Sequence, residues 1–461
     1  MNPYSFVLPE AFHPGDFLRS PDLIPRRDDA RFFVSLIVTK MAQRDLDRRG
    51  LAILHAKFLN KVMHKDTCAK VIEALLDGGV VERFGYKVGE RSFGYRLCRR
   101  YVSGKHIRVP ATDPGLIRRL ERRCTRYSSE LESRMLPVHR ALAKLQSRLR
   151  IHGDEARSIL DRVVETTKYR HQDSPERVRM CQRILIDDIE QRQFHVNVGT
   201  YGRMTNNITS LQREIRTQLH VNGEPLSSLD LSCAQPAFIT RLIADTGIMP
   251  NATNADPVNA DPANAHDEAT ARNQPQAKQG TGNETKQDQQ PSIYDSEKND
   301  PFLANPKVLG ERDGGKLQFQ QLVETGELYD CLLANLQLRG IETARQKIKK
   351  RVLVDVIARG KRYPASDEEI AFREMFPWVS RFIRDFNRLD HGNLIRELQR
   401  RESNLVIEVV CADLVARFPE MFMITLHDAV YVRPGDVHRV EQAFEREFDR
   451  VGCRMRLKVE S

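Results

Sequence analysis

The stretch Met421–Pro434, MFMITLHDAVYVRP, decides the fold because it predicts a β-hairpin with a carboxylate at its tip. Apolar residues alternate with less apolar ones through Phe422–Leu426, which is typical of a half-buried strand. Val430–Val432 begins a second strand of β-branched and aromatic residues, and His427 and Asp428 lie between the two. An acid in this position either makes the turn or serves a partner such as a metal ion, because a buried charge must be paired.

Length and composition indicate a globular protein of several domains. The 461 residues are too many for one hydrophobic core, and 40% are hydrophobic and 30% charged. No stretch approaches the roughly 18 apolar residues of a membrane span, and the N-terminus lacks the features of a signal peptide, so we expect a cytoplasmic protein without a membrane partner. The eight cysteines stand singly, which argues against a zinc ribbon or a disulfide framework. The net charge of +10 suits a polyanionic partner.

The N-terminal part predicts a small module after an irregular start. Residues 1–30 are Pro-rich, and we expect them to be irregular. In residues 31–110, helices are expected over Leu51–Met63 and after the capping residue Thr67, followed by strands over residues 80–88 and 93–97. This order resembles a winged helix-turn-helix, which often places its second helix on DNA. The alternative is that the module packs against the rest of the chain and never touches DNA.

Residues 111–192 predict long basic helices. Their positive charge is one-sided, and it is carried by Arg118, Arg119, Arg122, Arg123, Arg126, Arg140, Lys144, Arg148 and Arg150. Such a charge run is either a solvated helix face or an arm that lies along a phosphate backbone.

Residues 193–461 alternate strands with helices. The segment over Leu219–Leu231 predicts a hairpin that ends near Asp230. Residues 250–300 are rich in Asn, Ala, Asp, Gln and Pro, which predicts a disordered insertion. Four helices are then expected before the hairpin of Asp428, over Phe319–Leu338, Thr343–Ala358, Glu368–Arg388 and Leu394–Phe418. A helix over Val437–Val451 and a strand over Met455–Val459 close the chain.

Asp230 and Asp428, each at the end of a predicted strand, suggest a site for two Mg²⁺ ions. Arg345 and Lys349 lie one helical turn apart between them in sequence, where they could grip a triphosphate. This pattern suggests nucleotidyl transfer.

Several short motifs follow one another in a recognisable order. Gly202-Arg203-Met204-Thr205, followed by Leu211-Gln212, looks like TGRLSS…NLQ, and the segment Asp230–Gln235, DLSCAQ, looks like DYSQIE. Arg345 and Lys349 match the motif RxxxK, and Phe376-Pro377 looks like the segment that follows the helix of that motif. Arg400, Asn404 and Glu408 fall where the pattern has Arg, Asn and Gln. Leu426-His427-Asp428 looks like the motif VHDE. With these motifs, the chain from about Phe194 to its C-terminus resembles the family A DNA polymerases, those like bacterial DNA polymerase I.

The resemblance implies an α+β fold with a right-hand polymerase palm of antiparallel strands, helical fingers, and a thumb formed by residues 111–192. It implies Asp230 and Asp428 as catalytic residues that bind two Mg²⁺ ions, with Mn²⁺ as a substitute and the Leu231 carbonyl as a further ligand. The residues implied to bind the nucleotide are Arg345, Lys349 and Gln235. Those implied to contact DNA are Arg203, Gln212, Arg400, Asn404, Glu408 and His427.

The sequence also departs from the family pattern. Gln235 stands where the family has a Glu that helps to exclude the ribose 2′-OH, and Ala429 replaces the Glu after the last motif. Leu353 and Ile357 stand where aromatic residues are expected, which leaves Lys350 and Arg351 open as alternative phosphate contacts. No segment before residue 190 looks like a proofreading exonuclease.

We therefore expect a template-directed DNA polymerase that adds dNTPs to a primer 3′-OH without proofreading. Its expected partners are primer–template DNA, deoxynucleoside triphosphates and replication accessory proteins. One alternative is an RNA polymerase or primase-like enzyme with relaxed sugar selection. The other is a non-catalytic winged-helix DNA-binding protein of replication or regulation.

Overall fold

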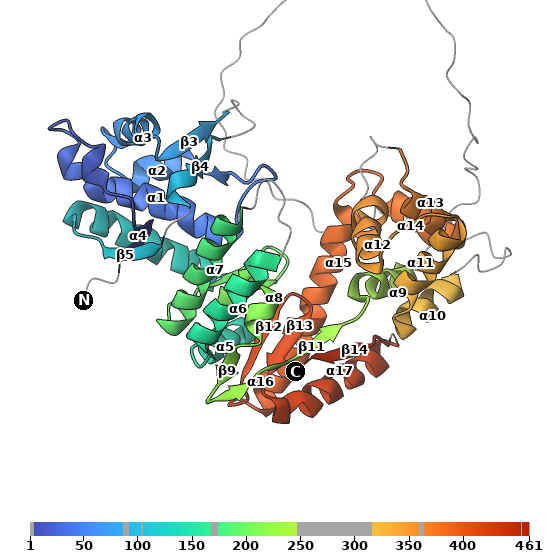
Figure 1. Cartoon of the computed structure of the whole chain (residues 1–461). Coiled ribbons are helices and arrows are strands. Elements are labelled where there is room, and N and C mark those ends of the chain that lie inside the picture. Colours follow the sequence, from blue (N-terminus) through green and yellow to red (C-terminus); the bar gives the residue numbers. More distant parts are fainter. Residues whose placement is uncertain are drawn as a thin grey trace, which may run out of the picture. The chain divides into compact units, whose positions relative to one another are not determined.

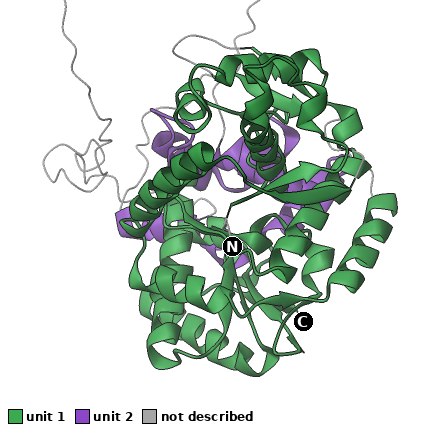
Figure 2. Ribbon diagram, turned by 90° about the vertical axis from the view of Figure 1, so that its left-hand side faces the viewer, with its two compact units in different colours: residues 1–238, 323–327, 395–461 green, residues 239–322, 328–394 purple. Residues whose placement is uncertain are grey.

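The computed structural model describes residues 4–85, 92–102, 105–166, 174–246, 316–358, 364–452 and 454–460. Within these ranges the chain is a mixed α+β structure, mostly helical, with small antiparallel sheets (Figure 1). It divides into two compact units, which Figure 2 colours separately: residues 1–238, 323–327 and 395–461, and residues 239–322 and 328–394. The insertion expected at residues 250–300 lies outside the described residues. Helices long and apolar enough to span a bilayer are absent from the described ranges.

The first unit begins with three helices and a three-stranded sheet of order β2–β4–β3. These elements are α1 (Arg27–Ala42), β2 (Ala52–Ile53), α2 (Ala56–Val62), α3 (Cys68–Asp77), β3 (Val81–Phe84) and β4 (Gly94–Leu97). Thr67 precedes α3 as predicted, but its hydroxyl lies 3.3 Å from the His64 ring instead of capping a backbone amide. The helix predicted over Leu51–Met63 is wrong at its start, where Ala52 pairs with Tyr95 as part of β2. A short apolar run fits helix and strand equally well, and the sheet partner decides between them.

The prediction of an irregular segment over residues 1–30 is also wrong in part. Ser5–Pro9 forms β1, which pairs antiparallel with β5 (His106–Pro110). The strand forms because Phe6, Val7 and Leu8 are all buried in the core. Its partner lies about a hundred residues further along the chain, where no local pattern points to it. The short helices η1 (Pro14–Asp16), η2 (Ile24–Arg26) and η3 (Arg99–Tyr101) complete this part.

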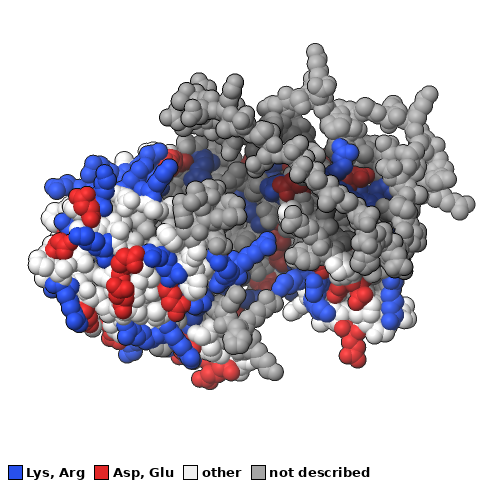
Figure 3. All heavy atoms as spheres, turned by 90° about the horizontal axis from the view of Figure 1, so that it is seen from above, with Lys and Arg blue, Asp and Glu red and all other residues white. Residues whose placement is uncertain are grey.

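The expected basic helices are present. They are α4 (Pro114–Glu132), α5 (Pro137–Gln146), α6 (Gly153–Thr166) and α7 (Pro175–Glu190), with the short strand β6 (Arg150–Ile151) between α5 and α6. Asp113 caps α4 by accepting a hydrogen bond from the Gly115 amide at 2.8 Å. In the view of Figure 3, Lys and Arg side chains lie interspersed with Asp and Glu side chains on the described surface.

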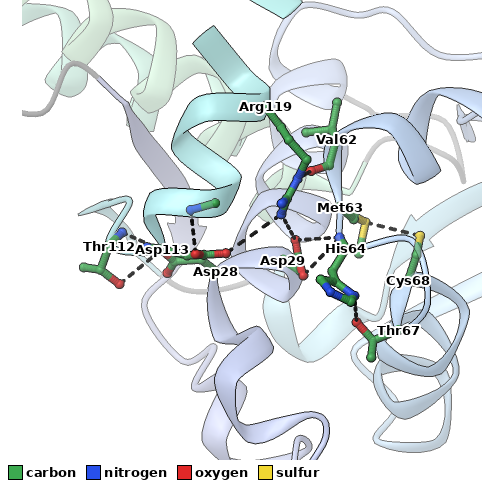
Figure 4. A network of polar contacts seen from close by, with 11 residues as sticks. Asp28, Asp29, Val62, Met63, His64, Thr67, Cys68, Thr112, Asp113 and Arg119 are labelled. Atoms are coloured by element: carbon green, nitrogen blue, oxygen red, sulfur yellow. Dashed lines mark hydrogen bonds and ion pairs between the residues drawn. The ribbon is translucent and has the colours of Figure 1, made fainter. Parts of the chain in front are cut away.

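Two buried acids of α1 join the first helices to the start of α4 (Figure 4). Asp28 accepts hydrogen bonds from the backbone amides of Thr112 and Asp113, the latter at 2.7 Å. Asp29 accepts a hydrogen bond from the His64 amide at 3.3 Å, and the Arg119 guanidinium lies 3.7 Å from it. These bonds replace the water that both carboxylates lose, so the network fixes α4 to α1.

A four-stranded antiparallel sheet of order β12–β13–β11–β14 lies in the C-terminal part of the first unit (Figure 1). The predicted hairpin of Asp428 is present as β12 (Met423–Leu426) and β13 (Ala429–Val432). The hairpin predicted over Leu219–Leu231 is wrong in its second strand. There β9 (Leu219–Val221) pairs with β10 (Glu224–Pro225), while β11 (Ser227–Leu231) inserts between β13 and β14 (Leu457–Glu460). Leu229 and Leu231 are buried in that central position, which is why β11 leaves the local hairpin.

Helices and part of the hydrophobic core support this sheet. The C-terminal α17 (Val437–Val451) packs against β11, and α5 packs against β12. Ile424 and Leu426 of β12 belong to the same hydrophobic cluster as the buried residues of β1 and α1. Between α7 and β9 the chain forms β7 (Val196–Val198), β8 (Met204–Asn206), η4 (Asn207–Ser210) and α8 (Arg213–Arg216), and η7 (Pro434–Asp436) precedes α17. The Asn206 amide donates to the Thr425 carbonyl at 3.0 Å, which ties the end of β8 to β12.

The remaining elements are helices, most of them in the second unit. They are α9 (Ala234–Thr246), α10 (Lys316–Thr325), α11 (Leu328–Leu338), α12 (Arg345–Arg351), η5 (Val352–Ile357), α13 (Asp367–Met375), α14 (Pro377–Phe386), α15 (Asn393–Ser403), η6 (Asn404–Cys411) and α16 (Ala412–Arg417). Two predicted helices are each broken: one at Gly326, whose φ of +78° ends α10, and one at Pro377, which begins α14. The helix predicted over Leu394–Phe418 is continuous but becomes a π-helix through η6.

Candidate functional site

The sheet register brings the two predicted metal-binding acids together. Asp230 on β11 lies directly opposite Ala429 on β13, and Asp428 is the residue just before Ala429. Both acids are partly exposed, whereas Leu231, which follows Asp230, is buried. On its other side Asp230 lies opposite Lys458, whose ammonium pairs with Glu460 at 2.7 Å. Two carboxylates therefore stand on neighbouring strands at one end of the sheet.

Two of the five described non-glycine residues with a positive φ lie beside these acids. The loop between β12 and β13 has only two residues, and His427 at its first position has a φ of +55°. Cys233, between β11 and α9, also has a φ of +55°. A side chain in this left-handed region costs roughly 1 kcal/mol per residue, and such strain gathers at functional sites.

A third acid, Glu402 on α15, lies beside this pair. Its side chain is only 2% exposed, and it forms an ion pair with the guanidinium of Arg203. Burial raises the pKa of Glu402 to about 7, and the nearby Asp428 carboxylate raises it further, while Arg203 and a hydrogen bond from Gln235 act against the rise. The predicted residues Arg203, Gln235 and Asp428 thus meet around an acid that we did not predict.

His427 shares this electrostatic environment. Partial desolvation of its ring lowers the pKa of His427, and the Arg203 cation lowers it again, while Asp428 opposes the change. A neutral imidazole at the turn can donate or accept one hydrogen bond without adding charge.

The loop that carries Arg203 is held from two sides. Gly202 has a φ of +73°, and its carbonyl lies 3.1 Å from Nε2 of the buried His139. A Cβ at Gly202 would lie 3.1 Å from a Glu408 carboxylate oxygen, so the loop passes close to η6. On η6, the Asn404 amide donates to Glu408 at 3.2 Å. The predicted residues Asn404 and Glu408 therefore lie next to the loop of Arg203, in a π-helical segment of the kind often found at functional sites.

The other two predicted DNA contacts lie elsewhere in the first unit. Arg400 is exposed on α15 and pairs with Glu397 at 3.0 Å. Gln212 precedes α8, and its backbone amide donates to the Gln182 side chain at 2.8 Å.

The predicted triphosphate contacts belong to the second unit. Arg345 and Lys349 are exposed on α12, four residues apart and therefore on one face. Arg345 pairs with Asp330 at 2.7 Å, an exposed pair that a stronger anion can replace. The alternative contacts Lys350 and Arg351 are exposed on the same helix. The chain continues directly into η5, where the positions of the expected aromatic residues are aliphatic.

The donor set fits a hard divalent cation. In the described ranges, no group of three or more His, Cys, Asp and Glu side chains is arranged to hold a metal ion. The site instead offers the carboxylates of Asp230 and Asp428 and the neighbouring main chain. Mg²⁺ is commonly bound by one or two carboxylates and completed by water and substrate phosphates, so two acids suffice for it.

Sequence reasoning missed Glu402 and His139. Glu402 lies within the run Arg400-Arg401-Glu402, which has the composition of a solvated helix face. The position of Glu402 in the sequence does point to the site, because it falls between the predicted residues Arg400 and Asn404. The apolar stretch of η6 follows it. His139 carries no local signal, since it lies in an ordinary amphipathic helix.

No protein-family model matches the sequence, and no curated protein matches it either.

Proposed function

We propose that the chain is a template-directed DNA polymerase that extends a primer 3′-OH with deoxynucleotides by two-metal nucleotidyl transfer. The observation that carries the proposal is the register of β11 and β13, in which Asp230 lies opposite Ala429 and therefore beside Asp428. The strained residues His427 and Cys233 next to these acids support it, because strain of this kind persists where function requires it.

The finer architecture of this proposal is a right-hand polymerase of the family A type. The sheet β12–β13–β11–β14 would be the palm, α4 to α7 the thumb, and the helices of the second unit the fingers. The module from α1 to β4 would be winged-helix-like, since its elements run α1, β2, α2, α3, β3, β4 along the chain and its sheet has the order β2–β4–β3. The antiparallel sheet with both acids and the basic helix α4 support this assignment.

The residues of the chain have separate tasks in the proposed reaction. Asp230 and Asp428 hold two Mg²⁺ ions, which when bound supply Lewis-acid stabilisation of the attacking and leaving oxygens. Arg345 and Lys349 bind the triphosphate of the incoming nucleotide, with Arg345 exchanging its exposed pairing to Asp330 for a phosphate. Arg203 and His427 contact the primer end.

Primer extension tests this function. Purified full-length protein is given a labelled primer–template and Mg²⁺, with dNTPs in one reaction and NTPs in the other. We expect extension with dNTPs. Duplex binding without extension by either substrate would contradict the polymerase and favour the non-catalytic DNA-binding protein.

The two acids provide the sharper test. Asp230→Ala and Asp428→Ala should each lower the extension rate by about 10²–10³-fold or more, because each removes charge stabilisation of the transition state. Duplex affinity and the unfolding midpoint should stay close to those of the unchanged protein. The matched control is Asp449→Ala on α17, an exposed acid that pairs with Arg454. Extension by both site variants at the rate of the control would refute the assignment.

One observation favours relaxed sugar selection as a second candidate. The Gln235 Oε1 atom is buried and has no hydrogen-bond partner among the described residues. A hydroxyl of the incoming sugar is a donor that would satisfy this acceptor. Extension with NTPs as well as with dNTPs would support the RNA polymerase or primase-like alternative. In that case Gln235→Glu should restore the preference for dNTPs.

A further inference from the structure

Glu402 is the most deeply buried acid at the candidate site, and the proposed reaction does not use it. Its side chain is 2% exposed, whereas Asp230 and Asp428 are partly exposed. An anion is costly in such a place unless it serves a partner, and its charged partner is Arg203. The pairing of Glu402 with Arg203 therefore calls for a role at the site.

Arg203 stands near two anions. Its guanidinium pairs with Glu402, and it also acts on the His427 ring, on which Asp428 acts as well. Asp428 in turn acts on Glu402. The Asn206 side-chain amide, three residues after Arg203, donates to the carbonyl of Thr425, three residues before Asp428, so the two segments lie side by side. An arginine that paired with Asp428 would compete with a divalent ion for the same oxygens.

The backbone at Arg203 is fixed, so only its side chain decides whether it pairs with Glu402 or with Asp428. The backbone before it is fixed, because the Gly202 carbonyl is held by His139 and the space beside Gly202 is occupied by Glu408. The Arg203 Nε atom is buried and has no hydrogen-bond partner among the described residues. If Glu402 were lost, the partly exposed Arg203 guanidinium would lose its charged partner, and Asp428 would be the anion left for it to pair with.

We propose that Glu402 is a positioning residue that holds Arg203 back from Asp428 and so keeps the Asp428 carboxylate available to a divalent cation. The inference rests on the proposed function, in that Asp428 is taken as a metal ligand. Glu402 acts through Arg203 and touches neither the metal nor the substrate. The Gln235 amide, which also hydrogen-bonds Glu402, helps to hold its carboxylate in place.

The same helix provides a matched control. Glu397 on α15 is also buried, with 9% of its side chain exposed, and it pairs with Arg400 at 3.0 Å and Arg401 at 2.8 Å. Glu397→Ala removes a buried acid and releases arginines, as Glu402→Ala does, but those arginines lie on α15 itself. A general effect of losing a buried acid would appear in both variants.

The test measures binding of Mn²⁺ alone to the full-length protein by titration calorimetry, without DNA or nucleotide, at pH 8. Glu402→Ala should weaken Mn²⁺ binding about tenfold, which is the scale of one competing charge at a partly buried carboxylate. Glu402→Gln, which keeps the shape of the side chain, should weaken it in the same direction. Glu397→Ala should bind Mn²⁺ as the unchanged protein does.

A double-mutant cycle separates positioning from the charge of Glu402 itself. If Glu402 acts by holding Arg203, then Glu402→Ala should have little effect in the Arg203→Ala background. If Glu402 attracts the metal directly, the loss will be the same in both backgrounds, and the inference is overturned. It is also overturned if both Glu402 variants bind Mn²⁺ normally. Absence of any Mn²⁺ site that depends on Asp428 would overturn the proposed function and this inference together, whereas a site that depends on Asp428 but not on Glu402 overturns the inference alone.

Discussion

The first unit holds buried acids in two places, and they behave in opposite ways. Asp28 on α1 and Glu402 on α15 are about equally buried, at 3% and 2% exposed. Burial opposes ionisation of both, but backbone amides of Thr112 and Asp113 outweigh it at Asp28, so the pKa of Asp28 falls. At Glu402 burial prevails over the Arg203 cation, and the pKa rises to about 7.

The difference lies in the donors. Asp28 accepts two main-chain N–H bonds, in addition to those from the Thr112 hydroxyl and the Arg31 guanidinium, and it joins α1 to α4 (Figure 4). Glu402 is met by side chains only, the Arg203 guanidinium and the Gln235 amide, and the Asp428 anion lies nearby. An acid held by backbone amides, such as Asp28, stabilises the fold. An acid that pairs with a side-chain cation close to a second acid, such as Glu402, can determine where that cation lies.

The largest expected effect concerns the structural acid. Asp28→Ala should lower the free energy of unfolding by about 3 kcal/mol, because it removes the buried acceptor that the Thr112 and Asp113 amides and the Arg31 guanidinium share. Glu402→Gln should change it by less than about 1 kcal/mol at pH 7.5, since a neutral amide fills the same space and the partly exposed Arg203 can turn to water. Urea unfolding of both variants checks this order. Equal losses would break the distinction between the two acids.

The second prediction uses pH, and the two acids should give slopes of opposite sign. Glu402 has a folded-state pKa above its unfolded value, so it stabilises the fold below about pH 4.5, and this stabilisation is lost as pH rises through about 7. The shift corresponds to at most about 3 kcal/mol. Asp28 has a lowered pKa, so its contribution is present above about pH 3.9 and is lost as pH falls further.

Unfolding of the metal-free protein between pH 3 and 8 measures both slopes. Glu402→Gln should flatten the decline between pH 4.5 and 7 and leave the acid limb unchanged. Asp28→Asn should flatten only the acid limb. A decline between pH 4.5 and 7 that survives in Glu402→Gln would assign it to another group.

The predictable parts of the molecule are those whose signals are local. The hairpin over Met421–Pro434 was predicted correctly because alternation and a short polar turn lie within fourteen residues. The helices expected within residues 111–192 are also present, as in α4, α5 and α7, since helical periodicity is local. The strand β11 was predicted to exist, but its partners β13 and β14 lie about 200 residues further along, so its removal from the local hairpin could not be foreseen.

The candidate site divides in the same way. Asp230 and Asp428 could be singled out because each ends a predicted strand, and the register then places them side by side. Glu402 could not, because its burial depends on Arg203, which lies 199 residues earlier in the chain. An acid in an Arg-rich helix has the same sequence pattern whether it faces water or a buried cation, and only tertiary structure separates the two cases.

The smallest effect concerns the loop that brings Arg203 to Glu402. Gly202→Ala should lower the free energy of unfolding by about 1–2 kcal/mol, because alanine is strained at a φ of +73° and its Cβ would press on Glu408 at 3.1 Å. Gly223→Ala is the matched control, since Gly223 has a φ of +83° and nothing within 4 Å of the added Cβ. The control should lose only the backbone part, about 1 kcal/mol. Urea unfolding gives the difference between the two variants, which isolates the contact with Glu408. If that difference is zero, η6 yields to the added methyl group, and the loop that carries Arg203 is then too soft to hold it near a chosen acid.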